Sequence, residues 1–149
     1  MEIKIRKSTD DDIPAIFGLI RELAIFEDGL DKVSNSVEQM KVEKDFFNCY
    51  VAVDNGEIIG MALYYFVYYT WVGKALYLDD LFVKEAYRGK GIGKQLMQKM
   101  MEVAREEKCH RMRLQVLSWN SNAIEFYKQT GFTVDQEWYN CDITEFGAL

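Results

Sequence analysis

The chain has 149 residues, of which 49% are hydrophobic and 28% charged, and its formal net charge is −6. This length and composition predict one globular domain over residues 1–149 and exclude a disordered chain. Because an acidic chain lacks the basic face that neutralises phosphates, we expect no nucleic-acid partner. The longest uncharged run, residues 58–73, is too short and too polar to cross a bilayer, so we also expect no membrane association.

Cysteine usage bears on the cellular compartment. Cys49, Cys109 and Cys141 form no CxxC pair, and His110 is the only histidine. We therefore expect neither a disulfide framework nor a bound metal. The N-terminus has no basic segment followed by an apolar run, which argues against secretion and favours the reducing cytoplasm.

The first half of the chain predicts a strand, two helices and a hairpin. Apolar and charged residues alternate over residues 3–5, and an apolar stripe from Ile13 to Ala24 has helical spacing. A weaker helix is expected over 36–47. The strands that follow flank Asn55-Gly56, a strong signal for a two-residue hairpin turn, and cover residues 50–53 and 57–69.

The second half alternates strands and helices. A strand over 75–83 is followed by a glycine-rich turn and a helix from Ile92 to about 108. A strand over 111–116 and a helix over 120–130 come next, with Gly131 as a left-handed residue after the helix. Residues from Phe132 onward are expected to be extended. The predicted order is β-α-α-β-β-β-α-β-α-β, an α/β fold with a mixed sheet, antiparallel in its first half and with a crossover around the glycine turn.

The turn itself, Arg88-Gly89-Lys90-Gly91-Ile92-Gly93, has the features of a phosphate-binding loop. Glycines allow the backbone to approach an anion, and the start of a helix presents free N–H groups and partial positive charge. The spacing does not fit a Walker loop, because Gln95 follows Gly93-Lys94 where Ser or Thr is needed. It does not fit a dinucleotide fingerprint either, because Lys94 stands where the third glycine belongs.

What fits is Arg-x-x-Gly-x-Gly, which resembles the pyrophosphate loop of the GNAT acetyltransferase superfamily. The resemblance covers nearly the whole chain, and two segments are similar to the spermidine/spermine (diamine) acetyltransferases: YYFVYYTWVGKALYLDDLFVKEAYRGKGIG and WNSNAIEFYKQTGF. It implies a GNAT fold and a single acetyltransferase domain. The implied reaction is transfer of an acetyl group from acetyl-CoA to a primary amine by direct attack on the thioester, without a metal.

The resemblance also implies where acetyl-CoA binds. The strand over 81–83 would lie along the pantetheine arm, with the backbone N–H of Leu81 or Phe82 polarising the thioester carbonyl. The pyrophosphate would lie on the glycine loop. The implied cofactor-binding residues are Leu81, Phe82, Val83, Arg88, Gly89, Lys90, Gly91, Ile92, Gly93, Lys94, Asn120 and Tyr127.

Two residues are implied as catalytic, and each has a simpler structural explanation, which for Asp79 is a strand-end carboxylate that contacts solvent or a neighbouring lysine. Tyr127 falls at the position of the family tyrosine that protonates the departing thiolate, although it could equally pack against its helix. Asp79 falls at the position of the proton-accepting glutamate but is one methylene shorter, so we expect it to act directly or through a water. Because adjacent residues of a strand face opposite sides, we expect only one of Asp79 and Asp80 to point into any one pocket.

The substrate site implied by the resemblance consists of Glu27, Trp71, Asp79 and Asp80, which suit a cationic amine through ion pairing and cation–π contact. The diamine enzymes carry Asp-Pro before the tryptophan, whereas this chain has Tyr69-Thr70. That difference leaves open a small diamine, a polyamine or a lysine-like amine.

Other functions remain as alternatives. Acetylation of peptide or protein N-termini would need a groove for extended backbone, and a catalytically inactive acyl-CoA-binding regulatory module would keep only the loop. Family members commonly form homodimers, and the aromatic C-terminal residues Trp138, Tyr139 and Phe146 suit such a contact.

Overall fold

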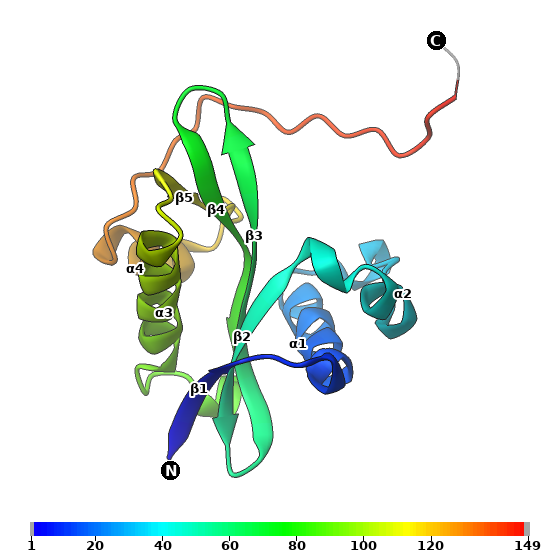
Figure 1. The fold of residues 1–149 in the computed structure, drawn as a ribbon, viewed down its shortest axis with the longest axis vertical. Helices are drawn as coiled ribbons and strands as arrows, with labels where there is room; N and C mark the ends of the chain where they lie inside the picture. The colour runs from blue at the N-terminus through cyan, green and yellow to red at the C-terminus, as the bar shows by residue number, and fades with distance from the viewer. Residues whose placement is uncertain (1, 148–149) are drawn as a thin grey trace. The chain divides into compact units, whose positions relative to one another are not determined.

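The computed structural model describes residues 2–147, and the chain divides into two compact units, residues 1–115 and 116–149. The first unit contains a five-stranded sheet in the order β1-β2-β3-β4-β5 (Figure 1). The pairings from β1 to β4 are antiparallel, and β4 pairs with β5 in parallel. The predicted mixed α/β fold is therefore confirmed, including its crossover. The strands are β1 (Ile3–Lys7), β2 (Asn48–Asp54), β3 (Glu57–Tyr69), β4 (Gly73–Val83) and β5 (Arg111–Arg113).

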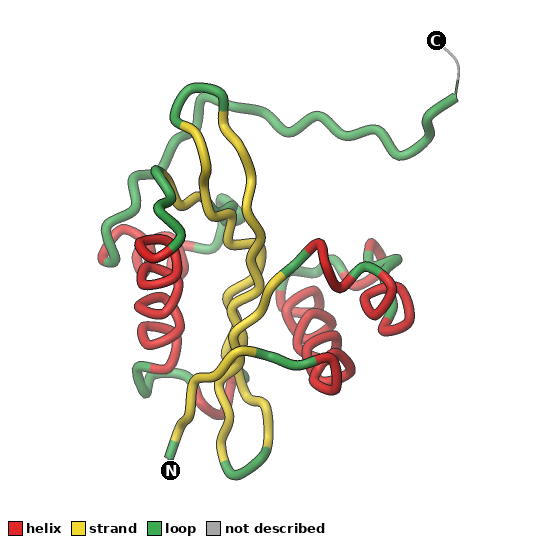
Figure 2. Tube along the Cα trace, in the orientation of Figure 1, coloured by secondary structure: helices red, strands yellow, loops and turns green. Residues whose placement is uncertain are grey.

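Helices cover both faces of this sheet. Figures 1 and 2 show α1 (Ile13–Phe26) and α2 (Val37–Val42) on one face and α3 (Ile92–Glu106) on the other. In α3, apolar residues at helical spacing are buried: Ile92, Leu96, Met100 and Val103, together with Met97. On the opposite face, one cluster joins the two helices to the sheet: Ile13, Ile16, Leu19, Met40, Cys49, Val51, Met61, Leu63 and Phe82.

The hairpin between β2 and β3 follows from its turn residues. Asn55 has φ 49° and Gly56 has φ 82°, so both central residues are in the left-handed region that a type I′ turn requires. β3 begins at Glu57 and ends at Tyr69, as predicted.

The helix predicted over 36–47 is shorter than expected. Ser36 caps α2 by accepting a hydrogen bond from the Gln39 N–H at 3.1 Å, but α2 ends at Val42 and a 3₁₀ turn follows over Lys44–Phe46. Met40 is the one residue of α2 that is fully buried, whereas the Val42 side chain is 87% exposed. The buried face of α2 therefore ends at Met40, before the turn.

The second unit contains α4 (Ser121–Gln129), followed by Gly131 at φ 106°, the left-handed position predicted for it. The strand expected after it is not found: residues 132–147 form neither helix nor strand. A single extended segment cannot pair its own N–H and C=O groups, so extended residues become a strand only beside another strand. Among residues 2–147, no helix combines the length and apolar content needed to cross a bilayer.

An ion pair fixes the start of α1. Asp12 is its N-cap, and the Asp12 carboxylate accepts hydrogen bonds from Arg6 Nη1 at 2.7 Å, Arg6 Nη2 at 3.1 Å and the Thr9 N–H at 2.7 Å. These bonds favour the charged form and hold the pKa of Asp12 at about 2, with Arg6 as the largest cause. The contact ties β1 to α1.

We predict that Asp12→Asn lowers the free energy of unfolding by about 1–2 kcal/mol at neutral pH. Because the pKa of Asp12 is depressed on folding, its stabilisation is complete above the unfolded value and is lost as pH falls through about 2. Urea unfolding between pH 7 and pH 2 should therefore show the two proteins converging in acid. Asp11→Asn, at the exposed neighbouring carboxylate, is the control; an equal loss in both variants would contradict the prediction.

Candidate active site

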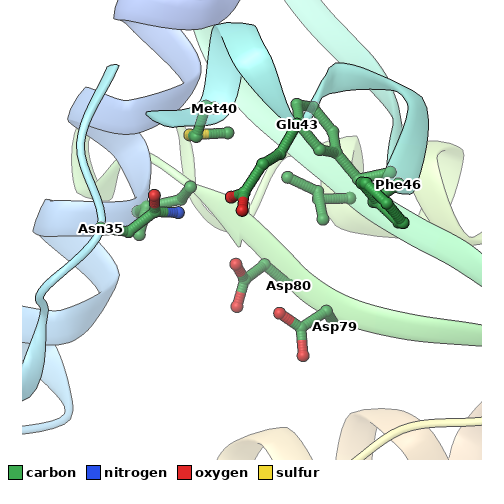
Figure 3. Close-up of a pocket in the computed structure, with 9 residues that line it drawn as sticks. Asn35, Met40, Glu43, Phe46, Asp79 and Asp80 are labelled. Carbon is green, nitrogen blue, oxygen red and sulfur yellow. The ribbon is translucent and has the colours of Figure 1, made fainter. Parts of the chain in front are cut away.

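The two aspartates of β4 lie at an irregularity in the sheet. Leu63 on β3 is opposite Asp80, but Tyr64 is opposite Leu78, so Asp79 is an extra residue with no partner in the ladder. Such a bulge interrupts the alternation of side chains. The expectation that only one of the two could enter a pocket is therefore wrong, because both line the same one (Figure 3).

That pocket has a volume of about 390 Å³ and combines apolar walls with acidic groups. Figure 3 shows Glu43, Asp79 and Asp80 around one space, with Asn35 at its side. The apolar walls come from α1, from the α2 region and from β3, and consist of Ile20, Met40, Phe46, Phe47 and Leu63.

Sequence reasoning missed Glu43 and Asn35. A continuous helix over 36–47 would place Glu43 in its interior, whereas the structure ends α2 at Val42 and leaves Glu43 at the junction with the 3₁₀ turn. Asn35 precedes α2, and its Oδ1 accepts a hydrogen bond from the Ser36 N–H at 2.8 Å. The pattern Asn-Ser before a helical segment could have identified this second residue as part of a fixed helix start.

Three of the predicted substrate residues, Glu27, Asp79 and Asp80, influence one another's pKa values. Burial, together with smaller contributions from the charges of Asp79 and Glu27, raises the pKa of Asp80 to about 7. Burial also raises the pKa of Glu27, with a second contribution from Asp79. The Asp79 pKa is likewise raised by burial, while a hydrogen bond from Tyr65 acts in the opposite direction. The three carboxylates thus repel one another, and a cation placed among them would relieve that repulsion.

The fourth predicted substrate residue lies elsewhere in the first unit. Trp71 is in the turn between β3 and β4, is 84% exposed, and is not one of the described residues that line the pocket. Gly73 and Asp79 are six residues apart on β4, about 20 Å at roughly 3.3 Å per residue. Trp71 is therefore separated from Asp79 by much of the strand's length.

The glycine loop has the backbone conformation that its sequence predicts. Gly89 and Gly91 have φ of 76° and 81°, and a side-chain carbon added at either would meet nothing within 4 Å. Gly91 is the N-cap of α3, and the first helical hydrogen bond runs from the Gln95 N–H to the Gly91 carbonyl at 3.1 Å. The N–H groups of residues 92–94 precede that bond and are available to an anion. These features fit a pyrophosphate.

Arg88 connects the loop to the end of β4. Its Nε donates a hydrogen bond to the Val83 carbonyl at 2.9 Å. Its guanidinium carbon lies 5.2 Å from the Phe82 ring centre and 5.4 Å from that of Phe26. Arg88 therefore holds the loop against the strand in addition to supplying positive charge.

The edge of β4 offers backbone groups to a ligand. Leu81, Phe82 and Val83 pair with β3 on one side, and the Phe82 side chain is buried in the core. On the other side, β5 pairs with β4 only at Ala75–Tyr77, and within residues 2–147 no other strand pairs with that edge. A peptide-like chain such as pantetheine could pair with it.

Asn120 and Tyr127 belong to the second unit. Asn120 is the N-cap of α4, its side chain accepting from the Ala123 N–H at 3.3 Å. The Tyr127 ring packs edge-to-face against Phe126 at 5.5 Å and Phe132 at 5.8 Å between centres. The structure thus shows Asn120 as a helix cap and Tyr127 as part of an aromatic cluster.

Comparison with known proteins identifies the family of the chain. Residues 17–132 match the acetyltransferase (GNAT) family. The chain is 40% identical over 141 residues to thialysine N-epsilon-acetyltransferase of Sus scrofa, covering 87% of this chain and 83% of that protein. It is 28% identical over 143 residues to spermine/spermidine N(1)-acetyltransferase of Bacillus subtilis, covering 92% and 91%.

A solved structure shows the same fold. An aminoglycoside acetyltransferase from an uncultured soil metagenomic sample has a TM-score of 0.79 over 96% of both chains, at 21% identity. The family match spans most of the chain and includes β4, the glycine loop and α3. The protein therefore belongs to the GNAT acetyltransferase family, whose members are acyltransferases.

Proposed function

We propose that the protein transfers an acetyl group from acetyl-CoA to one end of a small amine that carries at least two ammonium groups. The observation that carries this proposal is the acid-lined pocket on β4, whose strand continues into the edge and glycine loop suited to the cofactor. None of the described residues that line the pocket is basic. Diamines, polyamines and lysine analogues such as thialysine share the required pair of ammonium groups.

The residues divide the work as follows. An alkylammonium, with a pKa of about 10, must lose a proton before its nitrogen can attack. Asp79 accepts that proton, directly or through a water, while Asp80, Glu27 and Glu43 hold the cationic chain. Acetyl-CoA supplies the activated acyl group. The backbone N–H of Leu81 or Phe82 polarises its carbonyl, and Tyr127 donates a proton to the departing thiolate.

The family alternatives are less well supported. Acetylation of a peptide N-terminus needs only one reacting amine, which gives no role to several neighbouring carboxylates. A regulatory module without catalysis gives no role to the acidic pair at the bulge.

We also propose that the protein acts as a homodimer in the cytoplasm. The C-terminal segment exposes large apolar side chains, with Tyr139 93%, Ile143 72% and Phe146 86% exposed, and a second copy would bury them. Cys49, Cys109 and Cys141 are all free thiols, as a reducing compartment favours.

An amine panel with Glu43→Gln tests the substrate class. With acetyl-CoA, we expect CoA release with spermidine, putrescine or thialysine and little with a monoamine or an N-terminal peptide. Glu43→Gln keeps the side-chain shape and should raise KM for the diamine several-fold at low salt, with a smaller effect at high salt. Glu38→Gln, on the exposed surface of α2, changes the net charge equally and should leave KM unaltered. Equal effects of both variants, or a preference for peptides, would refute the assignment.

A charge test addresses the cofactor loop. Gly91→Glu and Gly91→Gln impose the same backbone strain at φ 81° and enter the same open space, but only Glu adds a negative charge at the helix start. We predict that calorimetry shows CoA affinity at least tenfold weaker in Gly91→Glu than in Gly91→Gln. Similar affinities in two folded variants would show that no anion binds there.

Replacement of the proposed acid tests the chemical step. Tyr127→Phe keeps the ring contacts with Phe126 and Phe132 and removes only the hydroxyl. We expect kcat to fall by roughly 10²-fold or more while acetyl-CoA affinity is retained. Tyr139→Phe, at an exposed tyrosine of the same unit, is the matched control. Turnover of Tyr127→Phe at the level of the control would reduce Tyr127 to a packing residue.

A further inference from the structure

The segment that joins β4 to α3 contacts the last two turns of α1 at two places. Lys84 Nζ lies 3.9 Å from Glu22 Oε2. The guanidinium carbon of Arg88 lies 5.4 Å from the centre of the Phe26 ring. Glu22 and Phe26 are four residues apart and therefore share one face of α1. That face is turned toward the segment that leads into the glycine loop.

The end of α1 is itself fixed by its backbone. The Asp28 N–H donates to the Ile25 carbonyl at 3.0 Å, and the Gly29 N–H donates to the Ala24 carbonyl at 2.8 Å. Asp28 has φ 56°, the left-handed conformation that ends many helices. Because these hydrogen bonds use backbone groups only, they do not depend on the side chain at position 26. Phe26 therefore presents its ring from a fixed helix end.

Arg88 is the group that gains from such a contact. An arginine side chain has many rotamers, and the freedom that it loses on binding an anion weakens that binding. Here the Arg88 Nε donates to the Val83 carbonyl at 2.9 Å, and the guanidinium lies over both the Phe82 and the Phe26 ring. The bond to Val83 uses Nε, and the guanidinium has further N–H donors on its two terminal nitrogens. Its orientation is thus set before an anion arrives.

The two rings differ in what else they do. Phe82 is buried in the core, whereas Phe26 is 47% exposed. The face of an aromatic ring attracts a cation, and a half-exposed ring can supply this attraction while contributing less to core packing. Resting on the proposed cofactor site, we infer that Phe26 is a positioning residue that orients the Arg88 guanidinium for the pyrophosphate of CoA.

The same helix end also carries a residue of the proposed amine site. Glu27 follows Phe26 directly, and the Glu27 N–H donates to the Leu23 carbonyl at 2.9 Å. This backbone bond holds Glu27 without the Phe26 ring. Loss of the ring should therefore weaken the binding of CoA and spare the binding of the diamine.

Calorimetry with CoA tests this role in Phe26→Leu, with Phe66→Leu as the matched control. Both variants remove a partly exposed ring beside a cation, since Lys74 Nζ lies 4.8 Å from the Phe66 ring centre, but only Phe26 contacts Arg88. We expect CoA affinity to fall about threefold in Phe26→Leu and to stay unchanged in Phe66→Leu. Phe26→Tyr keeps a ring and should recover most of the lost affinity. Equal affinities of the two leucine variants would overturn the inference.

A double-mutant cycle shows whether the ring acts through the arginine. In an Arg88→Ala background, Phe26→Leu should weaken CoA binding no further, because the guanidinium that the ring orients is absent. Equal losses in both backgrounds would overturn the inference. Without ligand, ¹⁵N relaxation of the Arg88 Nε–H group, assigned with Arg88→Ala, should show a lower order parameter in Phe26→Leu but not in Phe66→Leu. An unchanged order parameter would contradict the proposed role.

Steady-state kinetics separate this role from a general disturbance of α1. Phe26→Leu should raise KM for acetyl-CoA about threefold and leave KM for the diamine unchanged. An equal rise in both would overturn the inference. If the wild type bound CoA but acetylated no diamine, the proposed function would be rejected, whereas the differences in CoA binding and relaxation would still establish the role of Phe26.

Discussion

The interrupted register between β3 and β4 is the constraint on which the site depends. In a regular ladder Asp79 and Asp80 would lie on opposite faces of the sheet. The extra residue on β4 brings both to one pocket, which Leu63 also lines. The strands on either side are long, 13 residues in β3 and 11 in β4, so regular pairing flanks the bulge and holds it in place.

The cluster of carboxylates has a free-energy cost that a bound cation would offset. Burial disfavours charge on Asp80, and Asp79 and Glu27 add to that effect, so the Asp80 pKa reaches about 7. No lysine or arginine among the described pocket-lining residues compensates for it. Elsewhere in the molecule a buried carboxylate is fully compensated, as for Asp12 with Arg6 and Thr9. The contrast between the two sites separates a structural acid, which stabilises the fold, from the acids that we propose bind a cationic substrate.

One strand connects the acidic pocket to the proposed cofactor site. Asp79 and Asp80 are followed directly by Leu81–Val83, whose outer edge is left open because β5 is short. The Arg88 hydrogen bond to the Val83 carbonyl then ties the strand end to the glycine loop and the start of α3. Rigid attachment of both sites to β4 would fix the distance between the two reactants, which is the main requirement for transfer between them.

The sequence by itself determined the features that depend on local backbone chemistry. Asn55-Gly56 specified a turn with two positive φ angles, the apolar spacing of α3 specified its buried face, and Gly89 and Gly91 specified a left-handed loop at a helix start. The gathering of Glu27 with the β4 aspartates followed from family resemblance. Only the tertiary structure decided the rest. The bulge depends on the pairing of β3 with β4. The end of α2 depends on which side chains the helix can bury. Residues 132–147 form no strand because no neighbouring strand pairs with them. The meeting of Glu43 with the β4 aspartates depends on the end of α2 and on the bulge together, and no local pattern in the sequence records such a meeting.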